Sequence, residues 1–344
     1  MSISIEICTL TSEHQEWDDY VRSHSEGSFF HLSAWQKVVD EVFGHDCYFL
    51  YAKNEHGIVG VLPLVEVKSS LFGHALVSTP FCVYGGVVAD NQEVKSALEA
   101  YACELAEQLQ VDYLELRYRH EQQNNFILKQ AHSTFGCEIA DSAEDILANV
   151  KKKQRAVIRH SLKNELLYSH DHNIDDFYHL LSISYRNLGT PIFTKQYFAS
   201  LIKHFQQDVD ITTIKDKDNK LSNAVMNFYF NDQVLPYYGG GDANARALKS
   251  ADFMYYQVLC HASEKGCKWY DFGRSKNGSG PYKYKKNWGM QPELLHYYYH
   301  LVNAKDLPNL SPNNPKYKLF IRMWQKLPLS ISQWIGPFLS KYLG

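Results

Sequence analysis

Residues 234–241 read Val-Leu-Pro-Tyr-Tyr-Gly-Gly-Gly, and residues 268–272 read Lys-Trp-Tyr-Asp-Phe. The apolar and aromatic part of each stretch is typical of a buried strand. The residues between the two stretches favour a helix that ends near Gly266. We therefore expect a strand, a glycine-rich turn, a helix and a second strand, in that order, and this order has a counterpart in the first half of the chain.

The first half repeats the pattern at a nearly constant distance. Tyr84-Gly85-Gly86 stands 154 residues before Tyr238-Gly239-Gly240, and Tyr113-x-x-x-Arg117 stands 157 residues before Tyr270-x-x-x-Arg274. Chance rarely preserves both the order of elements and their spacing, so a duplicated unit is the economical explanation. Periodicity predicts strands at 2–8, 47–53, 58–68, 81–89 and 113–117 with helices at 12–24, 31–43 and 93–110 in the first copy, and helices at 174–188 and 195–206 with strands at 209–215, 221–230, 234–238 and 268–272 in the second.

These patterns predict an α+β protein with two tandem domains, each a mixed central sheet flanked by helices. A chain of 344 residues is long enough to bury two cores. We place the boundary near 141–149, which gives a first domain at 1–145, a second at 146–305 and a basic, aromatic tail at 306–344.

Composition restricts the classes of function. The formal net charge of −3 provides no overall surface for a polyanion, so we expect no DNA partner and only a local anion site. The seven cysteines are scattered and form no Cys-x-x-Cys pair, which is typical of reduced thiols in a cytoplasmic protein. We expect no signal peptide, membrane span or metal site, and a solvated loop is favoured over a metal site at His170-Asp171-His172.

The chemistry is expected in residues 270–289, where the second of the two strands ends. Glycines in this stretch allow backbone N–H groups to approach a phosphate or carboxylate closely. The stretch also carries five cations and five aromatic rings, and the cations are Arg274, Lys276, Lys283, Lys285 and Lys286. These features predict a site for an anionic group, whereas the alternative is a basic hairpin exposed to solvent.

The order of elements in each copy resembles the Gcn5-related N-acetyltransferase fold (GNAT, or acyl-CoA N-acyltransferase-like). In that fold the fourth and fifth strands separate and the acyl group of the donor lies between them, which implies a gap between 234–238 and 268–272. Two such copies, a Lys/Arg-rich helix that opens the second, and a closing aromatic-Lys-x-x-aromatic-Gly element together resemble the FemABX peptidyltransferases. That family moves amino acids from aminoacyl-tRNA onto peptidoglycan precursors. The resemblance covers nearly the whole chain.

Further motifs resemble a FemAB subgroup from exopolysaccharide loci of PEP-CTERM/exosortase bacteria. They are Gly60-Val61-Leu62-Pro63-Leu64, Leu188-Gly189-Thr190-Pro191, Asp271-Phe272-Gly273-Arg274-Ser275-Lys276, Lys286-Asn287-Trp288-Gly289 and Trp324-x-x-Leu327-Pro328. The resemblance implies an acyl- or aminoacyltransferase that forms an amide on an amine of a cell-envelope glycan, peptidoglycan precursor or exopolysaccharide. The alternative is a non-catalytic protein that binds a glycan or lipid carrier during exopolysaccharide assembly.

The resemblance assigns the transfer step to Lys285. The lysine of the FemABX pattern Phe-Lys-x-Gly-Phe-Gly acts in transfer, and the matching residues here are Tyr284-Lys285-Lys286-Asn287-Trp288-Gly289. Tyr284 replaces the first Phe and Asn287 the first Gly, and the loss of a glycine changes the turn that aims the lysine. Independently of any family, a fixed cation stabilises the tetrahedral oxyanion of amide formation.

The predicted catalytic residues are Lys285, its neighbour Tyr284 and Asp271. Asp271 is a candidate general base, with a buried carboxylate paired to Arg274 or Lys276 as the alternative. The predicted helix at 151–163 places its cations on one face, which is either a rail for phosphates or a solvated surface. Tyr237 and Tyr238 line the acceptor site or pack as half-buried strand residues. The predicted substrate-binding residues are Arg155, Arg159, Arg186, Tyr237, Tyr238, Arg274, Lys276, Lys283 and Trp288. The first copy lacks the Gly/Lys loop, so we expect it to act as a scaffold or acceptor platform.

The donor is either aminoacyl-tRNA or acyl-CoA, and no bound cofactor is expected. Gly239-Gly240-Gly241-Asp242 only partly matches a turn that holds the diphosphate of coenzyme A, and an aspartate beside phosphate favours another donor. Residues 314–344 of the tail carry basic and aromatic residues without acidic ones, which suits either a helix on an anionic membrane surface or a C-terminal helix docked across both domains. We therefore expect a cytoplasmic protein, with peripheral contact to the inner membrane as an additional hypothesis.

Overall fold

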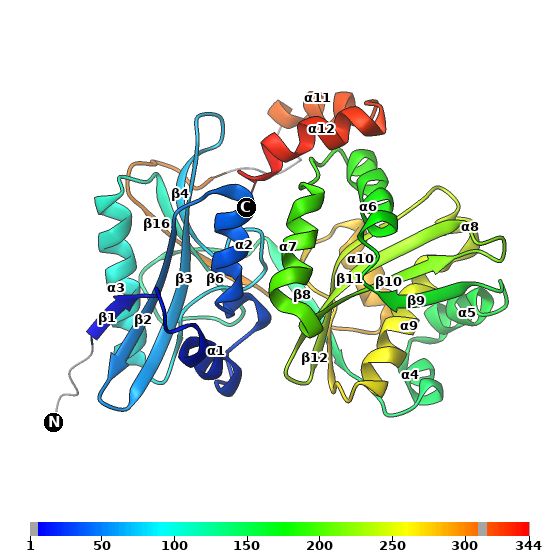
Figure 1. Ribbon diagram of the computed structural model, residues 1–344, viewed down its shortest axis with the longest axis horizontal. Helices are drawn as coiled ribbons and strands as arrows, with labels where there is room; N and C mark the ends of the chain where they lie inside the picture. The colour runs from blue at the N-terminus through cyan, green and yellow to red at the C-terminus, as the bar shows by residue number, and fades with distance from the viewer. Residues whose placement is uncertain (1–5, 309–314, 344) are drawn as a thin grey trace. The chain divides into compact units, whose positions relative to one another are not determined.

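The computed structural model describes residues 6–308 and 315–343, which form two compact units, each with its own sheet and helices (Figure 1). Unit 1 is formed by Met1–Ala131, Leu294–Asn309 and Lys341–Gly344, and unit 2 by His132–Glu293 and Leu310–Ser340. Each unit has an eight-stranded mixed sheet, so the predicted α+β class with mixed sheets flanked by helices is confirmed.

In unit 1, helices cover both faces of the sheet (Figure 1). Adjacent residues of a strand point to opposite faces, so Phe49 stacks on Trp17 of the first helix, while Leu50 joins the cluster that contains Leu98 of the third. The strand order is β1 (Glu6–Thr9), β2 (Cys47–Asn54), β3 (Gly57–Ser69), β4 (Gly73–Ser78), β6 (Tyr113–Tyr118), β16 (His296–Leu301) and β7 (Ile127–Lys129), with β5 (Val88–Ala89) paired to β3. The helices are α1 (His14–Ser23), α2 (Ala34–Phe43) and α3 (Gln92–Gln108).

Unit 2 is built in the same way. Val225 packs in a cluster with Val258, whereas Phe228 packs with Tyr238, whose ring contacts Phe198 on the other side of the sheet. The strand order is β14 (Ser275–Lys276), β8 (His132–Glu138), β13 (Trp269–Asp271), β12 (Gln233–Gly241), β11 (Leu221–Phe230), β10 (Val209–Lys215) and β9 (Leu167–Asp171), with β15 (Pro292–Leu294) paired to β8. The helices are α4 (Ala143–Asn149), α5 (Lys152–Ser161), α6 (Ile174–Leu188), α7 (Lys195–Phe205), α8 (Ala245–Leu248), α9 (Ser250–Glu264), α10 (Gly280–Trp288), α11 (Pro315–Trp324) and α12 (Leu329–Ser340).

Each sheet is completed by a strand from the other half of the sequence. β8 follows the first copy but pairs with β13 and β14 in unit 2, and β16 follows the second copy but pairs with β6 and β7 in unit 1. The units therefore differ from the expected ranges 1–145 and 146–305: residues 132–145 lie in unit 2, and residues 294–305 lie in unit 1.

Most predicted elements are present, with two local differences. Of the strand expected at 81–89, only β5 is present. Residues 79–86, between β4 and β5, form an irregular segment instead, and the N–H groups of Gly85 and Gly86 donate to the Arg117 carbonyl (3.0 and 2.9 Å). The aromatic, basic stretch expected as a turn or hairpin is a helix, α10. Ser279 caps the amide of Tyr282, a proline stands in the first turn, and Gly289 ends the helix at φ 110°.

Candidate active site

Strands β12 and β13 separate soon after they meet. Their parallel pairing covers only Gln233 with Trp269 and Val234 with Tyr270, while β12 continues to Gly241. The expected gap between the fourth and fifth strands of the second copy is therefore present. Separated strands leave N–H and C=O groups that can bind a ligand with amide groups.

The far end of β12 is held against α6 by its glycines. A Cβ on Gly240 would lie 2.6 Å from Leu181 Cα, so only glycine allows this approach. The Ser184 hydroxyl accepts a hydrogen bond from Gly241 N at 2.8 Å and donates one to its carbonyl at 3.2 Å. The glycine triplet thus directs β12 toward α6.

Tyr255 of α9 lies between the separated strands. Its ring meets Phe272, just after β13, at 4.6 Å, and its hydroxyl would lie 3.3 Å from a Cβ on Gly239 of β12. Burial, and secondarily the charge of Asp252, raise the pKa of Tyr255 to about 12, so the hydroxyl stays protonated at neutral pH. No pattern in the sequence pointed to Tyr255, because it reaches this position only through the packing of α9 on the sheet.

Lys285 extends from α10 to the end of β13. Its Nζ donates hydrogen bonds to the carbonyls of Gly273 (2.9 Å) and Arg274 (3.2 Å), and the residue is only 9% exposed. The rings of Phe272 and Phe135 lie 5.2 and 5.8 Å from the ammonium. Burial lowers the pKa of Lys285 to about 8, with Arg274 acting in the same direction and Asp271 against it. The side chain is therefore still mainly cationic at neutral pH.

Asp271 shapes the turn that Lys285 binds. Its Oδ1 accepts hydrogen bonds from Gly273 N (2.7 Å) and Thr134 Oγ1 (3.2 Å), and the residue is almost fully buried. These contacts fix the backbone whose carbonyls receive the Lys285 ammonium. They give Asp271 a positioning role, and its use as a general base stays a prediction.

The two aromatic candidates of α10, Tyr284 and Trp288, pack against α9. Tyr284 donates to Asp252 Oδ1 at 2.8 Å, and burial together with this carboxylate holds the pKa of Tyr284 well above its usual range. Gln154 of α5 donates to the same oxygen, so three helices meet at this carboxylate. Trp288 is buried near Phe272 and Tyr255. Tyr284 and Trp288 therefore hold α10 in place, which leaves Lys285 as the residue of this helix that reaches β13.

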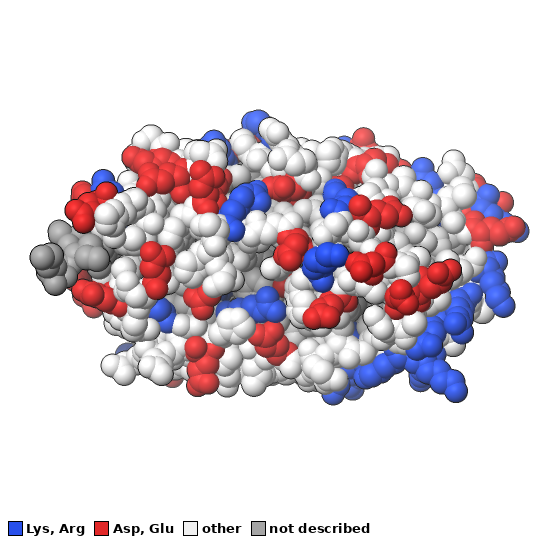
Figure 2. All heavy atoms as spheres, turned by 90° about the horizontal axis from the view of Figure 1, so that it is seen from below, with Lys and Arg blue, Asp and Glu red and all other residues white. Residues whose placement is uncertain are grey.

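The basic helix α5 divides into a structural and an exposed part. The Arg155 guanidinium donates to the carbonyls of Ala148 (2.6 Å) and Val150 (3.0 Å) at the end of α4. Lys151 donates to the Lys286 carbonyl of α10 at 2.9 Å. Figure 2 shows Lys and Arg side chains gathered at the right-hand end of the molecule, where α5 lies in Figure 1. Besides Lys151, the exposed cations of this segment are Lys152, Lys153, Arg159 and Lys163.

The remaining candidates differ in their surroundings. Tyr238 is buried among rings, with its hydroxyl 2.9 Å from that of Tyr197, and Tyr237 packs on Phe228. Arg186 donates to the side chain of Asn187 at 3.0 Å. Two of these three residues thus have the packing role that was their alternative interpretation. The cations near α10 are partly or fully exposed, and they are Arg274, Lys276 and Lys283.

A cluster of His170, Asp210 and His261 in unit 2 could offer three ligand atoms to a metal, all within 4.8 Å of one another. However, the two imidazoles stack at 3.9 Å with an interplanar angle of 10°, and a metal must lie near the plane of each ring that binds it. Asp210 Oδ2 already accepts from Tyr229 (2.7 Å) and lies 3.6 Å from the Lys265 ammonium. The geometry suits a hydrogen-bonded cluster better than a bound ion.

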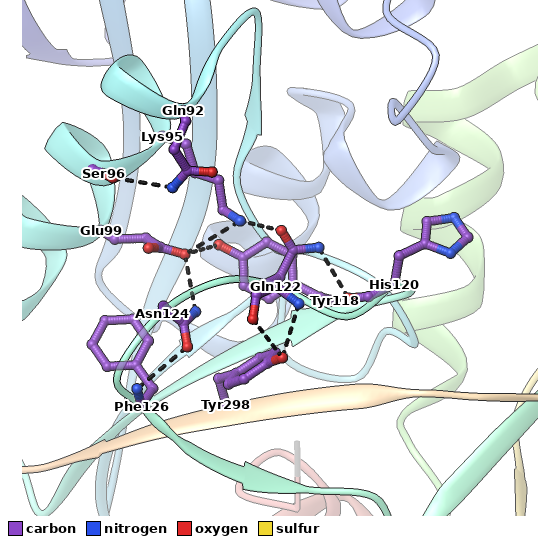
Figure 3. Close-up of polar contacts among 10 residues, drawn as sticks. All are labelled: Gln92, Lys95, Ser96, Glu99, Tyr118, His120, Gln122, Asn124, Phe126 and Tyr298. Atoms are coloured by element: carbon purple, nitrogen blue, oxygen red, sulfur yellow. Dashed lines mark hydrogen bonds and ion pairs between the residues drawn. The ribbon is translucent and has the colours of Figure 1, made fainter.

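Unit 1 closes the corresponding region with its own chain. Arg117 is buried and donates to the Cys82 carbonyl at 2.7 Å and to Glu115 Oε1 at 2.8 Å. Nearby, Figure 3 shows a polar network at α3: Tyr118 donates to Glu99 at 2.6 Å, and Lys95, which lies 3.9 Å from Glu99, donates to Gln122. These polar groups satisfy one another, which indicates a structural role for the network.

Comparison with known proteins identifies the fold. Residues 146–286 match a family model described as an acetyltransferase (GNAT) domain. A crystal structure of FemX is similar at 16% identity and a TM-score of 0.68, covering 92% of this chain and 100% of that one. A C-terminal domain of a putative lysylphosphatidylglycerol synthetase from Agrobacterium fabrum is 12% identical, with a TM-score of 0.57 and coverages of 85% and 91%. A tandem GNAT protein from the clavulanic acid biosynthesis pathway is 11% identical, with a TM-score of 0.53 and coverages of 88% and 100%.

No protein of curated function matches the sequence. The chain has the GNAT fold in tandem, as the order of elements predicted. At these identities the likeness is one of fold. The PEP-CTERM/exosortase subgroup stays a prediction.

Proposed function

We propose that the chain is an acyltransferase in which unit 2 joins an acyl or aminoacyl group to an amine, with Lys285 supplying positive charge at the transfer step. The observation that carries this proposal is a buried ammonium at the end of β13, next to the point where β12 and β13 separate. The tandem GNAT fold supports the reaction class, because proteins described as acetyltransferases share it.

In this reaction the acceptor nitrogen forms a bond to the carbonyl carbon of the donor and loses a proton. The bond to the donor's ester oxygen or thioester sulfur then breaks, and the leaving group takes up a proton. Negative charge develops on the carbonyl oxygen between these steps. Among the described residues, Nζ of Lys285 has two hydrogen-bond acceptors, so its third N–H remains for that oxygen.

Two donor classes fit the charges of unit 2. Aminoacyl-tRNA and acyl-CoA both carry phosphates, and the exposed cations Lys152, Lys153, Arg159 and Lys163 lie on one segment at α5. Two observations favour aminoacyl-tRNA as the donor. The fold is similar to that of FemX, and the glycine turn only partly matches a coenzyme A site. The proposed acceptor is an amine of a cell-envelope glycan or peptidoglycan precursor, in free or lipid-linked form. Unit 1 would serve as scaffold or acceptor platform.

Transfer is tested by incubating the protein with labelled aminoacyl-tRNA or labelled acyl-CoA and a set of amino-sugar and lysine-containing acceptors, and measuring the amide product. Lys285→Met should reduce the transfer rate by roughly 100-fold or more, as the loss of one oxyanion donor does in other acyl transfers. Lys286→Met removes a neighbouring exposed lysine and should change the rate little.

Equal rates in the parent and Lys285→Met would remove this lysine from the mechanism. Absence of turnover with both donors, together with binding of a glycan or lipid carrier, would favour the alternative of a non-catalytic binding protein in exopolysaccharide assembly.

A further inference from the structure

The two C-terminal helices dock on α6 through small side chains. Gly189, at the end of α6, would place a Cβ 2.4 Å from Ile321 Cγ2 of α11, and Gly336 of α12 would place one 2.9 Å from the backbone of Ile192. Gln333 of α12 donates to Ser182 Oγ of α6 at 3.0 Å. Figure 1 shows α11 and α12 beside the end of α6. Helices α11 and α12 are therefore anchored to unit 2, whereas the docked alternative placed the tail across both domains.

The amphipathic character of α12 is inverted relative to a helix in a water-soluble protein. Its buried residues are Ser332, Gly336 and Ser340, which follow one another at intervals of four. Trp334 and Phe338, also four apart, are 70% and 63% exposed. A docked helix normally buries its large apolar residues, whereas α12 exposes two of them to solvent.

On α11, apolar exposure and positive charge run side by side. Leu319 and Met323 are 68% and 63% exposed. Lys318 and Arg322 of α11, and Lys326 in the turn that follows it, are also exposed and recur every four residues. The sequence has no Asp or Glu from residue 307 to its end, so no acidic side chain of this segment offsets the three charges.

None of the described helices has both the length and the apolar character to cross a bilayer. Exposed aromatic and aliphatic side chains combined with basic ones are suited to the interface of an anionic bilayer, where rings enter the headgroup region and cations meet lipid phosphates. A neutral partner protein would give the three cations no counter-charge.

We propose that the exposed face of α11 and α12, formed by Lys318, Leu319, Arg322, Met323, Lys326, Trp334 and Phe338, binds the surface of an anionic lipid bilayer. The contact is peripheral and reversible. It would bring the protein to lipid-linked acceptors, but it does not depend on the proposed transferase activity.

The test is co-flotation of the full chain with vesicles of phosphatidylcholine alone or of phosphatidylcholine with phosphatidylglycerol. The chain should float with the anionic vesicles, bind them less as salt increases, and bind neutral vesicles at least about tenfold more weakly. Trp334→Ser with Phe338→Ser should reduce anionic binding by about tenfold or more. Lys318→Gln, Arg322→Gln and Lys326→Gln together should reduce it by roughly 100-fold, because each basic residue contributes about fivefold.

Matched controls locate the contact. Lys152→Gln, Lys153→Gln and Lys163→Gln remove the same charge from α5 and the residues just after it, and Tyr168→Ser removes an aromatic residue that is 53% exposed on β9. These variants should bind the vesicles like the parent. Circular dichroism and thermal unfolding establish that every variant is folded.

Three outcomes would overturn the proposal: no flotation with anionic vesicles, equal loss of binding in the α5 variant, or a parent that is oligomeric by light scattering while the Trp334→Ser, Phe338→Ser variant is monomeric. The last would assign the face to a second copy of the chain. Vesicle binding needs no acyl donor, so its failure would leave the transferase proposal standing, and the reverse also holds.

Discussion

The buried ammonium of Lys285 should make the stability of the protein depend on pH in a predictable direction. Burial lowers the pKa of this lysine to about 8 from an ordinary value of 10.5. Between these two values the unfolded chain binds more protons than the folded one, so stability rises as pH increases from about 8 toward 10.5. The stabilisation that comes from this pKa difference is complete above pH 10.5, the pKa of the lysine in the unfolded chain. It is lost as pH falls through about 8, the pKa of Lys285 in the folded protein.

The size of the effect follows from the gap between the two values. A gap of about 2.5 pKa units corresponds to about 3 kcal/mol over the whole range, and to about 2 kcal/mol between roughly pH 7 and pH 9.5. Lys285→Met removes this titration while keeping a side chain of similar length. The free energy of unfolding of the parent minus that of the variant should therefore increase by about 2 kcal/mol over this interval.

Urea denaturation monitored by tryptophan fluorescence at several pH values measures this difference. Other groups that titrate in the interval, including the buried tyrosines, are present in both proteins and largely cancel. Lys286→Met, at the next and exposed position of α10, is the control, and its difference from the parent should stay within about 0.5 kcal/mol. A difference for Lys285→Met that is flat, or that shrinks as pH increases, would show that no cation is buried at the end of β13.

Three further predictions follow from particular contacts. If Lys285 acts as a cation, kcat/KM for transfer should decrease as pH rises through about 8, the pKa of this lysine, whereas action as a general base would make it increase there. Glu99→Ala should lower the free energy of unfolding by about 3 kcal/mol or more, because Tyr118 and the Lys95 charge lose a buried partner. Glu104→Ala, at an exposed position of the same helix, is the control and should lower it by under about 0.5 kcal/mol in the same urea titration. Burial lowers the pKa of His31 to about 4, so its contribution to stability is present above pH 6.5 and is lost as pH falls through 4. The difference in free energy of unfolding between the parent and His31→Gln should shrink by about 3 kcal/mol over that range. An unchanged difference in acid unfolding would contradict this.

Local patterns in the sequence predicted most of the helices and strands. The repeated order of these elements then predicted the tandem fold. The separation of β12 from β13 followed from the resemblance in element order. Helix α10 was also within reach of sequence reasoning, since Ser279 before a proline and Gly289 nine residues after the helix start are helix-boundary signals. The density of glycine and lysine in this stretch led instead to the prediction of a turn.

Other features depend on long-range pairing and have no local signal. β8 and β16 were not among the predicted strands, and nothing in either segment indicates which sheet it joins. Tyr255 and Phe135 approach the site from a helix and from one of these exchanged strands. Asp271 could be predicted as buried and polar, but its partners Thr134 and Gly273 could not.

The two units differ at the parallel strand pair, and this difference supports the proposal that the chemistry lies in unit 2: β4 pairs with β6 through Ala75–Val77 and then ends, whereas β12 continues to Gly241 beyond its pairing with β13. In unit 1, Gly85 and Gly86 donate backbone hydrogen bonds to Arg117, whose guanidinium returns one to Cys82. Backbone groups paired in this way have little left to offer a ligand, and opening the space would break several hydrogen bonds at once. In unit 2, the side chain of Tyr255 lies between the strands, and moving a side chain breaks no backbone hydrogen bond of either strand. We therefore expect a donor to enter unit 2, which also carries Lys285, and not unit 1, where backbone hydrogen bonds hold the corresponding segment.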